Sequence, residues 1–188
     1  MHGSDIRFFP PTNARTHEVS GAGAFVFVFT LATRLGGKLL WVREAWDTVQ
    51  LNPNGFSDFI DPAAVTLCSA KDQKEVLAVA ENALRSGAVT LVVMTLSQPI
   101  GLTEGRRLQL AARDGISTGV AIIPEGMGSN AAETRWRCSP AYDASSPPQD
   151  STLQKWELIK NKSGTLGVWN VRWHTASRRL IVVPPAGK

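Results

Sequence analysis

Short apolar segments alternate with amphipathic segments over residues 16–123, and they predict strands and helices in turn. Residues 72–85 carry apolar side chains at three- and four-residue spacing, which is typical of one helix face. Residues 89–94 are continuously apolar, as in a strand buried on both faces of a parallel sheet. We expect strands at 16–20, 38–42, 65–69, 89–94 and 118–123, helices at 21–35, 72–85 and 103–115, a turn at 52–55 and one helical turn at 56–60. This alternation predicts an α/β fold with a mostly parallel central sheet and helices on both faces.

The pattern changes after residue 140. Residues 140–150 are polar and rich in proline, which predicts a loop. Three strand-like segments with short connections follow, at 156–160, 168–173 and 179–183. Their close spacing predicts antiparallel strands added to one end of the parallel sheet. We therefore expect an irregular arm over 1–15, a single domain over 16–183 that includes the Pro-rich loop at 140–150, and a tail over 184–188.

Composition indicates a soluble globular protein. The chain has 188 residues, of which 43% are apolar, enough for a sizeable core. Cys68 and Cys138 are too few and too far apart to predict a disulfide framework or a zinc site, so we expect buried thiols and a reduced, cytoplasmic setting. The longest apolar run, 22–32, is too short to cross a bilayer, and we expect no membrane partner.

The positive charge is concentrated near the C-terminal end. Residues 151–188 carry seven basic side chains and one acidic side chain, a net charge of +6, whereas residues 1–150 have a net charge of −2. A basic end on a nearly neutral body is typical of a protein with an anionic partner. A solvated surface without a partner explains the same charge equally well.

A glycine turn follows the first predicted strand, where many α/β proteins bind phosphate. A working phosphate-binding loop needs Gly, four further residues, Gly, Lys and then Ser or Thr. Counted from Gly21, the last three positions hold Val26, Phe27 and Val28, which neither donate a charged hydrogen bond nor ligate a metal. The sequence thus predicts a protein that does not hydrolyse nucleotides, is not an enzyme and holds no cofactor.

Several stretches nevertheless resemble the core of RecA-type ATPases. Residues 65–89 are similar to the strand, helix and strand that lead into the Walker B motif, and residues 156–162 contain a similar Lys-Asn-Lys run. Within the RecA superfamily, residues 17–19, 102–112 and 133–137 resemble the ImuA group, accessory proteins of bacterial mutagenesis cassettes. The resemblance covers roughly residues 16–173 and implies a RecA-like three-layer core.

Two positions depart from the RecA pattern. The Walker B aspartate falls at about Thr95, whose hydroxyl cannot replace a carboxylate that holds Mg²⁺-bound water. The general-base glutamate falls near Glu44, which we expect to face solvent or form a salt bridge because no phosphate site accompanies it. We expect only the arm over 1–15 before the core, in place of most of the helical region that commonly precedes a RecA core.

The ImuA resemblance implies a non-catalytic adaptor in error-prone translesion synthesis during the SOS response to DNA damage. The implied partners are a Y-family polymerase-like protein and an error-prone replicative polymerase, with RecA as a further candidate, in the cytoplasm and in part at the nucleoid. The alternatives are a nucleotide-binding ATPase regulator with an irregular phosphate site and a direct single-stranded DNA-binding protein.

Two pairs of basic residues are the candidate partner-binding residues. Arg106 and Arg107 lie in the first turns of a predicted helix, where the helix dipole disfavours a cation, so one of them is expected to have a partner. That partner is either Glu104 or Asp114 of the same chain or another protein. Lys160 and Lys162 alternate along a strand, so they share a face and suit an acidic protein surface or a nucleic-acid backbone.

The nucleic-acid candidates are the basic residues of the C-terminal strands. DNA binding is expected to be weak, non-specific and sensitive to salt. The set comprises Lys160, Lys162, Arg172, Arg178 and Arg179. Trp156, Trp169 and Trp173 lie on the same strands, where core packing competes with base stacking as their role. The glycine-rich loop 126–130 is either a mobile connector or a DNA-contacting loop, and none of the histidines has a metal-ligand spacing.

Overall fold

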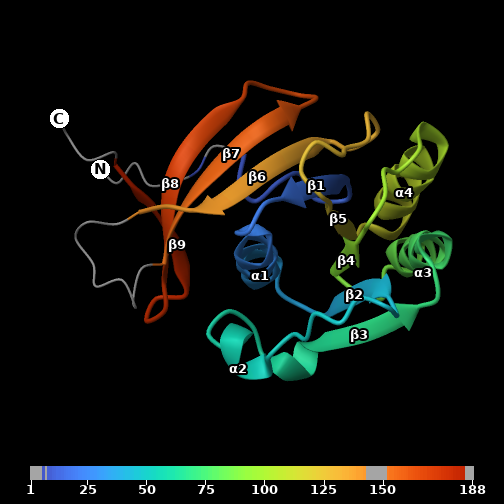
Figure 1. The fold of residues 1–188 in the computed structure, drawn as a ribbon, viewed down its shortest axis with the longest axis horizontal. Coiled ribbons are helices and arrows are strands. Elements are labelled where there is room, and N and C mark those ends of the chain that lie inside the picture. The colour runs from blue at the N-terminus through green and yellow to red at the C-terminus, as the bar shows by residue number, and fades with distance from the viewer. Residues whose placement is uncertain (1–5, 7, 143–151, 185–188) are drawn as a thin grey trace.

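The chain folds around one mixed β-sheet in a computed structural model that describes residue 6, residues 8–142 and residues 152–184 (Figure 1). The elements follow one another in this order: β1 Thr16–Ser20, α1 Ala24–Leu35, β2 Leu39–Glu44, α2 Pro53–Phe56, a 3₁₀ turn Pro62–Ala64, β3 Val65–Ala70, α3 Gln73–Ser86, β4 Leu91–Thr95, α4 Leu102–Gly115, β5 Thr118–Ile122, β6 Thr134–Pro140, β7 Leu153–Asn161, β8 Gly167–His174 and β9 Arg179–Val183. Strands and helices alternate as far as β5, and only strands follow.

Within these described residues, nine strands are ordered β3-β2-β4-β5-β1-β6-β7-β8-β9. The strands from β3 to β6 in this order pair in parallel. From β6 to β9 each pairing is antiparallel. The structure therefore confirms the predicted fold class, a mostly parallel α/β sheet with antiparallel strands added at its C-terminal end.

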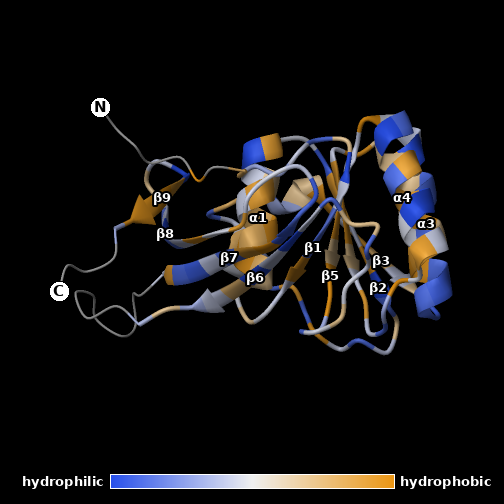
Figure 2. Cartoon of the chain, turned by 90° about the horizontal axis from the view of Figure 1, so that it is seen from above, coloured by the Kyte–Doolittle hydropathy of each residue, from blue (hydrophilic) through white to orange (hydrophobic). Residues whose placement is uncertain are grey.

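Helices cover both faces of the parallel strands, as Figure 2 shows. On one face α1 packs with large aromatic side chains, among them Trp41, Trp136 and Trp156. On the other face α3 and α4 lie side by side, and their buried positions include Val76 and Leu108. Because the central strands are apolar on both sides, they bury two separate hydrophobic clusters rather than one.

Helix α3 has the ends that its sequence predicts. The Asp72 carboxylate accepts a hydrogen bond from the Glu75 amide at 2.9 Å, so it serves as the N-cap. Gly87 follows the helix at φ 66°, a left-handed conformation that glycine adopts without strain. For α4, in contrast, the expected cap at Thr103 is wrong. Gly101 takes the extended conformation that a cap requires (φ −63°, ψ 161°), and Thr103 lies inside the helix.

The helix in this region begins earlier than expected. Helix α2 spans Pro53–Phe56 and overlaps most of the turn expected at 52–55, while the helical turn expected at 56–60 follows it, since the Ile60 amide donates to the Phe56 carbonyl at 3.1 Å. The Asn52 side chain accepts a hydrogen bond from the Asn54 amide at 3.1 Å, and Pro53 occupies the first helical position. Proline is preorganised for that position because its φ is fixed near the helical value and its missing amide leaves no donor unpaired.

The described part of the N-terminal arm, residue 6 and residues 8–15, contains no helix or strand and packs against the core. The Phe9 ring lies 5.5 Å from the ring of Phe27 and 5.1 Å from that of Trp156. Residues 143–150 of the predicted Pro-rich loop and residues 185–188 of the tail lie outside the described residues. In the described part of the chain, no helix is long and apolar enough to cross a membrane.

Candidate functional site

The glycine turn between β1 and α1 is packed against the neighbouring strand β6. The Gly23 amide donates a hydrogen bond to the Cys138 carbonyl oxygen at 2.9 Å. A Cβ atom on Gly21 would lie 2.3 Å from the same oxygen, and Gly21 has a φ of +90°. Backbone of β6 therefore occupies the space beside the turn where a bound phosphate would approach the amides.

Two amides at the start of α1 also have partners within the protein. The Ala24 amide donates to the Gly21 carbonyl at 3.0 Å, and the Phe27 amide donates to the Gly23 carbonyl at 3.1 Å. Phe27 and Val28, which stand where a Lys-Ser or Lys-Thr pair would bind phosphate and metal, are fully buried in the core. This helix start resembles an ordinary packed turn more closely than an anion site.

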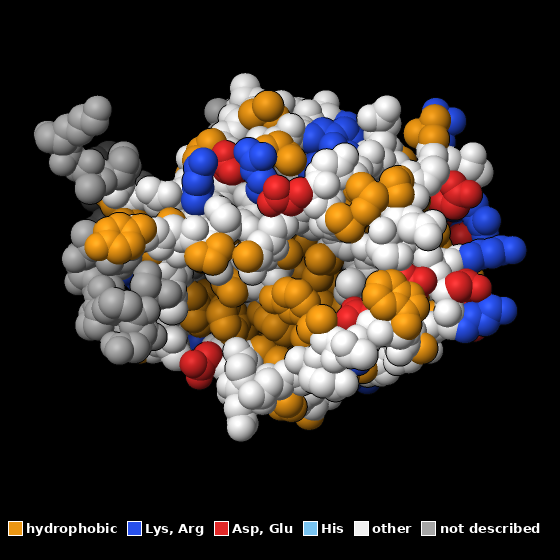
Figure 3. Space-filling view, viewed as in Figure 1, with side chains coloured by type: hydrophobic (Ala, Val, Ile, Leu, Met, Phe, Trp, Pro, Cys, Tyr) orange, Lys and Arg blue, Asp and Glu red, His pale blue; other side chains and the backbone are white. Residues whose placement is uncertain are grey.

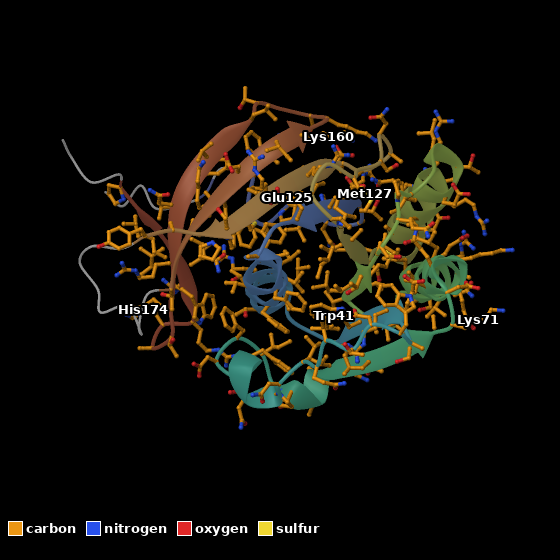
Figure 4. The ribbon with its side chains drawn as sticks, viewed as in Figure 1. Trp41, Lys71, Glu125, Met127, Lys160 and His174 are labelled. Carbon is orange, nitrogen blue, oxygen red and sulfur yellow. The ribbon has the colours of Figure 1, made fainter. Side chains whose placement is uncertain are left out.

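Aromatic side chains fill the adjoining end of the sheet. The Trp41 indole nitrogen donates to the Thr95 hydroxyl at 2.9 Å, so the threonine in the Walker B position is engaged with a neighbouring strand. The Phe25 ring stacks on Trp41 with a centroid distance of 5.2 Å. Figure 4 labels Trp41 on β2, on the side toward α1.

Glu44 does not lie where it was expected. The side chain neither faces solvent nor forms a salt bridge with any described residue: Glu44 is 8% exposed, and its Oε2 accepts a hydrogen bond from the Ser97 hydroxyl at 2.7 Å. The turn after β2 folds back over the strand end, because the Asp47 amide donates to the Glu44 carbonyl at 3.0 Å. This turn covers the glutamate and removes most of it from water.

Two of the candidate partner-binding residues, Arg106 and Lys162, line one groove of about 500 Å³. We call it the basic groove, and it is formed by Leu102, Arg106, Gln109 and Leu110 of α4 together with Asn130, Ala131 and Lys162. Leu102 and Leu110 are 48% and 47% exposed, so the groove combines positive charge with accessible apolar surface.

Lys160, in β7, and Lys162, just after it, both bind the β5–β6 loop. As predicted, they point to one side: Lys160 Nζ donates to the carbonyls of Ser129 and Asn130 at 3.2 and 3.0 Å, and Lys162 Nζ donates to the Ala131 carbonyl at 2.6 Å. Partial burial lowers the pKa of Lys160, and the nearby Lys162 lowers it further. Figure 4 shows Lys160 beside the loop that bears Met127. Much of the hydrogen-bonding capacity of these lysines is therefore used inside the protein.

A buried ion pair between Glu18 and Arg135 also holds the β5–β6 loop. Glu18 of β1 is 2% exposed, and its Oε2 accepts from Arg135 Nε at 2.7 Å. Its Oε1 accepts from the Ser129 amide at 2.7 Å, and Arg135 also donates to the Ser129 carbonyl at 3.0 Å. Hydrogen bonds thus anchor the Ser129 end of the glycine-rich loop. Every residue of β1 is buried, so a glutamate in this strand is the sequence feature that marks the network.

Helix α4 approaches this loop closely because residue 105 is glycine. A Cβ atom on Gly105 would lie 2.6 Å from the Ala131 Cβ and 2.8 Å from the Ser129 hydroxyl oxygen. Gln109 reaches across the same contact, with its amide nitrogen 2.9 Å from the Ala131 carbonyl and 3.0 Å from the Thr16 carbonyl. The helix wall of the basic groove is therefore held by hydrogen bonds to two other elements.

The two arginines of α4 differ in their surroundings. Arg107 forms an ion pair of 2.7 Å with Glu81 on α3. The expected alternatives within the chain were Glu104 and Asp114, but Asp114 pairs with Arg113 at 3.0 Å. Arg106 is exposed and has no ion pair or side-chain hydrogen bond with the described residues. Of the two, Arg106 is available to a partner at the basic groove.

The five nucleic-acid candidates do not form one patch. Arg172 pairs in register with Leu153 at the start of β7, whereas Lys160 lies seven residues further along that strand, about 23 Å away at the usual rise. Arg178 donates a hydrogen bond to the Phe59 carbonyl, and Arg179 begins β9 beyond the next turn. The sheet thus separates Lys160 and Lys162 from the other three residues.

The tryptophans of β7 and β8 pack inside the protein. Trp156 is fully buried, Trp173 is 6% exposed and stacks on Phe59 at 4.6 Å, and Trp169 packs against Trp136 at 5.9 Å. These contacts favour core packing over base stacking as their role.

The buried polar groups beside the groove have structural partners. His17 Nε2 lies 2.8 Å from the Thr12 carbonyl, which can only accept, so this nitrogen carries the proton and Nδ1 accepts from the Thr134 hydroxyl at 2.8 Å. Burial lowers the pKa of His17 to about 4, so the ring is neutral at physiological pH.

Burial also raises the pKa of the Cys138 thiol. No group of three His, Cys, Asp or Glu side chains suited to a metal ion occurs among the described residues.

Neither the models of known protein families nor the curated protein sequences contain a match to this chain.

Proposed function

We propose that this protein is a non-catalytic, RecA-like adaptor that acts through protein–protein contacts in error-prone translesion synthesis after DNA damage. The observation that carries the non-catalytic part is the glycine turn, where the Gly23 amide bonds to Cys138 of β6 at 2.9 Å. A phosphate-binding loop uses such amides to donate hydrogen bonds to its ligand. Here the amide donates to a carbonyl of the protein instead.

The adaptor role draws on the segments that resemble the ImuA group. One of them, residues 102–112, forms most of α4, and its residues Gly105 and Gln109 dock the helix on the β5–β6 loop. Another, residues 133–137, contains Arg135 of the buried ion pair. The proposed partners are those of that group: a Y-family polymerase-like protein and an error-prone replicative polymerase, with RecA as a further candidate, in the cytoplasm or at the nucleoid.

The basic groove is the proposed docking surface. Arg106 is exposed without a described partner, and two half-exposed leucines, Leu102 and Leu110, flank it on the same helix. Arginine beside exposed leucine suits a partner segment that combines carboxylates with apolar side chains. Since Lys160 and Lys162 donate to loop carbonyls, their proposed role shifts from direct contact toward shaping the groove.

Direct binding of single-stranded DNA is the weaker candidate. The basic residues of the C-terminal strands are separated along the sheet, and the tryptophans beside them are packed. Any binding to DNA is expected to be weak and to fall steeply with salt, because it would rest on charge alone.

The test compares two adjacent arginines on α4. Each of the variants Arg106→Ala and Arg107→Ala is co-expressed with the Y-family polymerase-like protein of the same organism, and the dissociation constant is measured on the purified pair. We expect Arg106→Ala to weaken binding about tenfold or more, equivalent to about 1.4 kcal/mol. Arg107→Ala is the matched control, because Arg107 pairs with Glu81 away from the groove. Unchanged affinity for Arg106→Ala, or no complex with the wild type, would count against the proposal.

A further inference from the structure

A second concave site lies at the carboxyl ends of the parallel strands, where open α/β sheets commonly bind ligands. It has a volume of about 350 Å³ and is open to solvent. We call it the aromatic pocket, and its walls include Phe25, Glu44, Trp46, Asp47, Val49 and Ser97. Figure 3 shows a hollow with an apolar floor on this face of the molecule, at the place that Trp41 marks in Figure 4. None of these residues belongs to the basic groove.

Trp46 is an exposed aromatic residue on a well-braced turn. The residue is 64% exposed, and its neighbour Val49 is 52% exposed. Two backbone hydrogen bonds hold the turn, from the Ala45 amide to the Ala70 carbonyl at 2.7 Å and from the Asp47 amide to the Glu44 carbonyl at 3.0 Å. The Val49 amide also donates to the Asp47 carboxylate at 3.0 Å, and Arg43 donates to the Val49 carbonyl. A large indole held out toward water at the rim of a pocket is typical of a recognition site.

Glu44 supplies a buried carboxylate to the same pocket. Glu44 is 8% exposed, and Oε2 accepts one hydrogen bond, from the Ser97 hydroxyl. Among the described residues no donor lies within hydrogen-bond distance of Oε1, and no Lys, Arg or His side chain lines the pocket. The attraction between opposite charges is stronger at a partly shielded carboxylate than in bulk water, so a positively charged ligand would be favoured there.

The side chains that line the pocket favour an organic cation as the ligand. Glu44 and Asp47 would repel an anion, and a purely apolar ligand would leave the carboxylate of Glu44 without a counter-charge. A planar guanidinium can stack on the ring of Trp46 while it donates to a carboxylate, and its apolar stem suits Val49 and Phe25. We infer that the aromatic pocket binds an arginine side chain from an apolar-flanked segment of a partner protein.

This inference goes beyond the proposed adaptor role and does not depend on it. The pocket uses a different set of residues and the opposite charge from the basic groove. A partner surface that carries both acidic and basic segments could engage both sites, but each site is testable alone.

The test uses an acetylated and amidated pentapeptide, Ala-Leu-Arg-Leu-Ala, with the full-length protein. Its binding is followed by NMR through the indole N–H signals of the six tryptophans, assigned with Trp46→Phe. We expect saturable shifts of the Trp46 signal. The same peptide with citrulline in place of arginine should bind at least about tenfold more weakly, because it keeps the shape and loses the charge.

Matched carboxylate variants show which side chain binds the arginine of the peptide. Glu44→Gln should weaken the arginine peptide about tenfold, and Asp58→Asn, a change at an exposed carboxylate outside the pocket, should leave its affinity unchanged. Equal affinity of the arginine and citrulline peptides would overturn the inference, as would an unperturbed Trp46 signal. Protection of Trp46 by self-association of the chain, seen as a rise in mass in light scattering, would also overturn it and would assign the pocket to a second copy.

Discussion

Two regions of the molecule each contain a buried glutamate. Glu18 lies beneath the β5–β6 loop that borders the basic groove, and Glu44 lines the aromatic pocket. The two carboxylates differ in the partners that surround them. Glu18 is 2% exposed and accepts hydrogen bonds from the Arg135 guanidinium and the Ser129 amide, each at 2.7 Å. Glu44 is 8% exposed and accepts one hydrogen bond, from a neutral hydroxyl. One carboxylate is therefore committed to the fold, whereas the other lines an open pocket and has one hydrogen bond with the described residues.

This difference separates structural charge from charge that is left for a partner. Around the groove, Lys160, Lys162 and Arg135 look like binding residues by type, yet their donors hold the β5–β6 loop. Arg106 on the same rim has no described partner. Surroundings, rather than residue type, thus indicate which side chains are free to act, and substitutions should separate the two groups by their effect on stability.

The largest expected effect comes from the Glu18 carboxylate. Glu18→Gln should lower the free energy of unfolding by about 3–5 kcal/mol, because it leaves the Arg135 guanidinium without its counter-charge. The measurement is urea denaturation followed by tryptophan fluorescence. Glu125→Gln, at an exposed carboxylate, is the control and should change stability by less than about 1 kcal/mol. Equal and small effects would place Glu18 among the charges that are not structural.

Low pH should decrease the free energy of unfolding through protonation of His17, which lies next to Glu18 in β1. The folded-state pKa of about 4 lies below the ordinary value of 6.5, so the unfolded chain binds more protons between these values. Stability should therefore fall as the pH is lowered from about 6.5 to 4, by about 3 kcal/mol in total. Denaturation curves of the wild type and His17→Gln across this range isolate the contribution, since the variant lacks it. A wild-type loss no larger than that of the variant would contradict the structural role of the neutral ring.

A smaller effect is expected where α4 meets the loop. Gly105→Ala places a Cβ 2.6 Å from that of Ala131, and the strain should outweigh the gain in helix propensity by about 1 kcal/mol. Gly55→Ala is the matched control, because its Cβ would meet the nearest atom, in Asn52, at 3.9 Å. That variant should be neutral or slightly stabilised in thermal unfolding. If both variants behave alike, the close approach of α4 does not constrain residue 105.

The smallest effect is expected in the aromatic pocket. Glu44→Gln should change the free energy of unfolding by less than about 1 kcal/mol, because no cation is lost and Ser97 can still donate to the amide oxygen. Chemical denaturation beside Glu18→Gln provides the comparison directly. A loss as large as that of Glu18→Gln would show that Glu44 is a structural carboxylate, and the contrast between the two regions would disappear.

The sequence predicted the regular elements better than it predicted the site. The period of the apolar residues placed α3 and the buried strands, because burial on one or both faces leaves a local pattern. The wrong cap at Thr103 and the unexpected helix start at Pro53 show that short local signals compete with one another. The common face of Lys160 and Lys162 followed from strand geometry.

Contacts between distant segments explain what the sequence could not predict. The carbonyls that bind Lys160 lie about thirty residues earlier in the chain, and the pair of Glu18 and Arg135 spans two neighbouring strands. The distance between Lys160 and Arg172 follows from the register of β7 and β8, which no local pattern specifies. Similarly, the burial of Glu44 results from a turn that folds back over its strand.

Nucleotide binding by the wild-type protein tests the central claim most directly, that the turn at Gly21–Gly23 is closed to phosphate. The measurement is equilibrium dialysis with labelled ATP and Mg²⁺, combined with NMR of the backbone amides of Gly23 and Ala24. The account predicts no saturable binding up to about 1 mM ATP and no shift of these amides, because they donate to the carbonyls of Cys138 and Gly21. Saturable binding in the micromolar range, with both amide signals displaced, would contradict it and would favour a nucleotide-binding regulator.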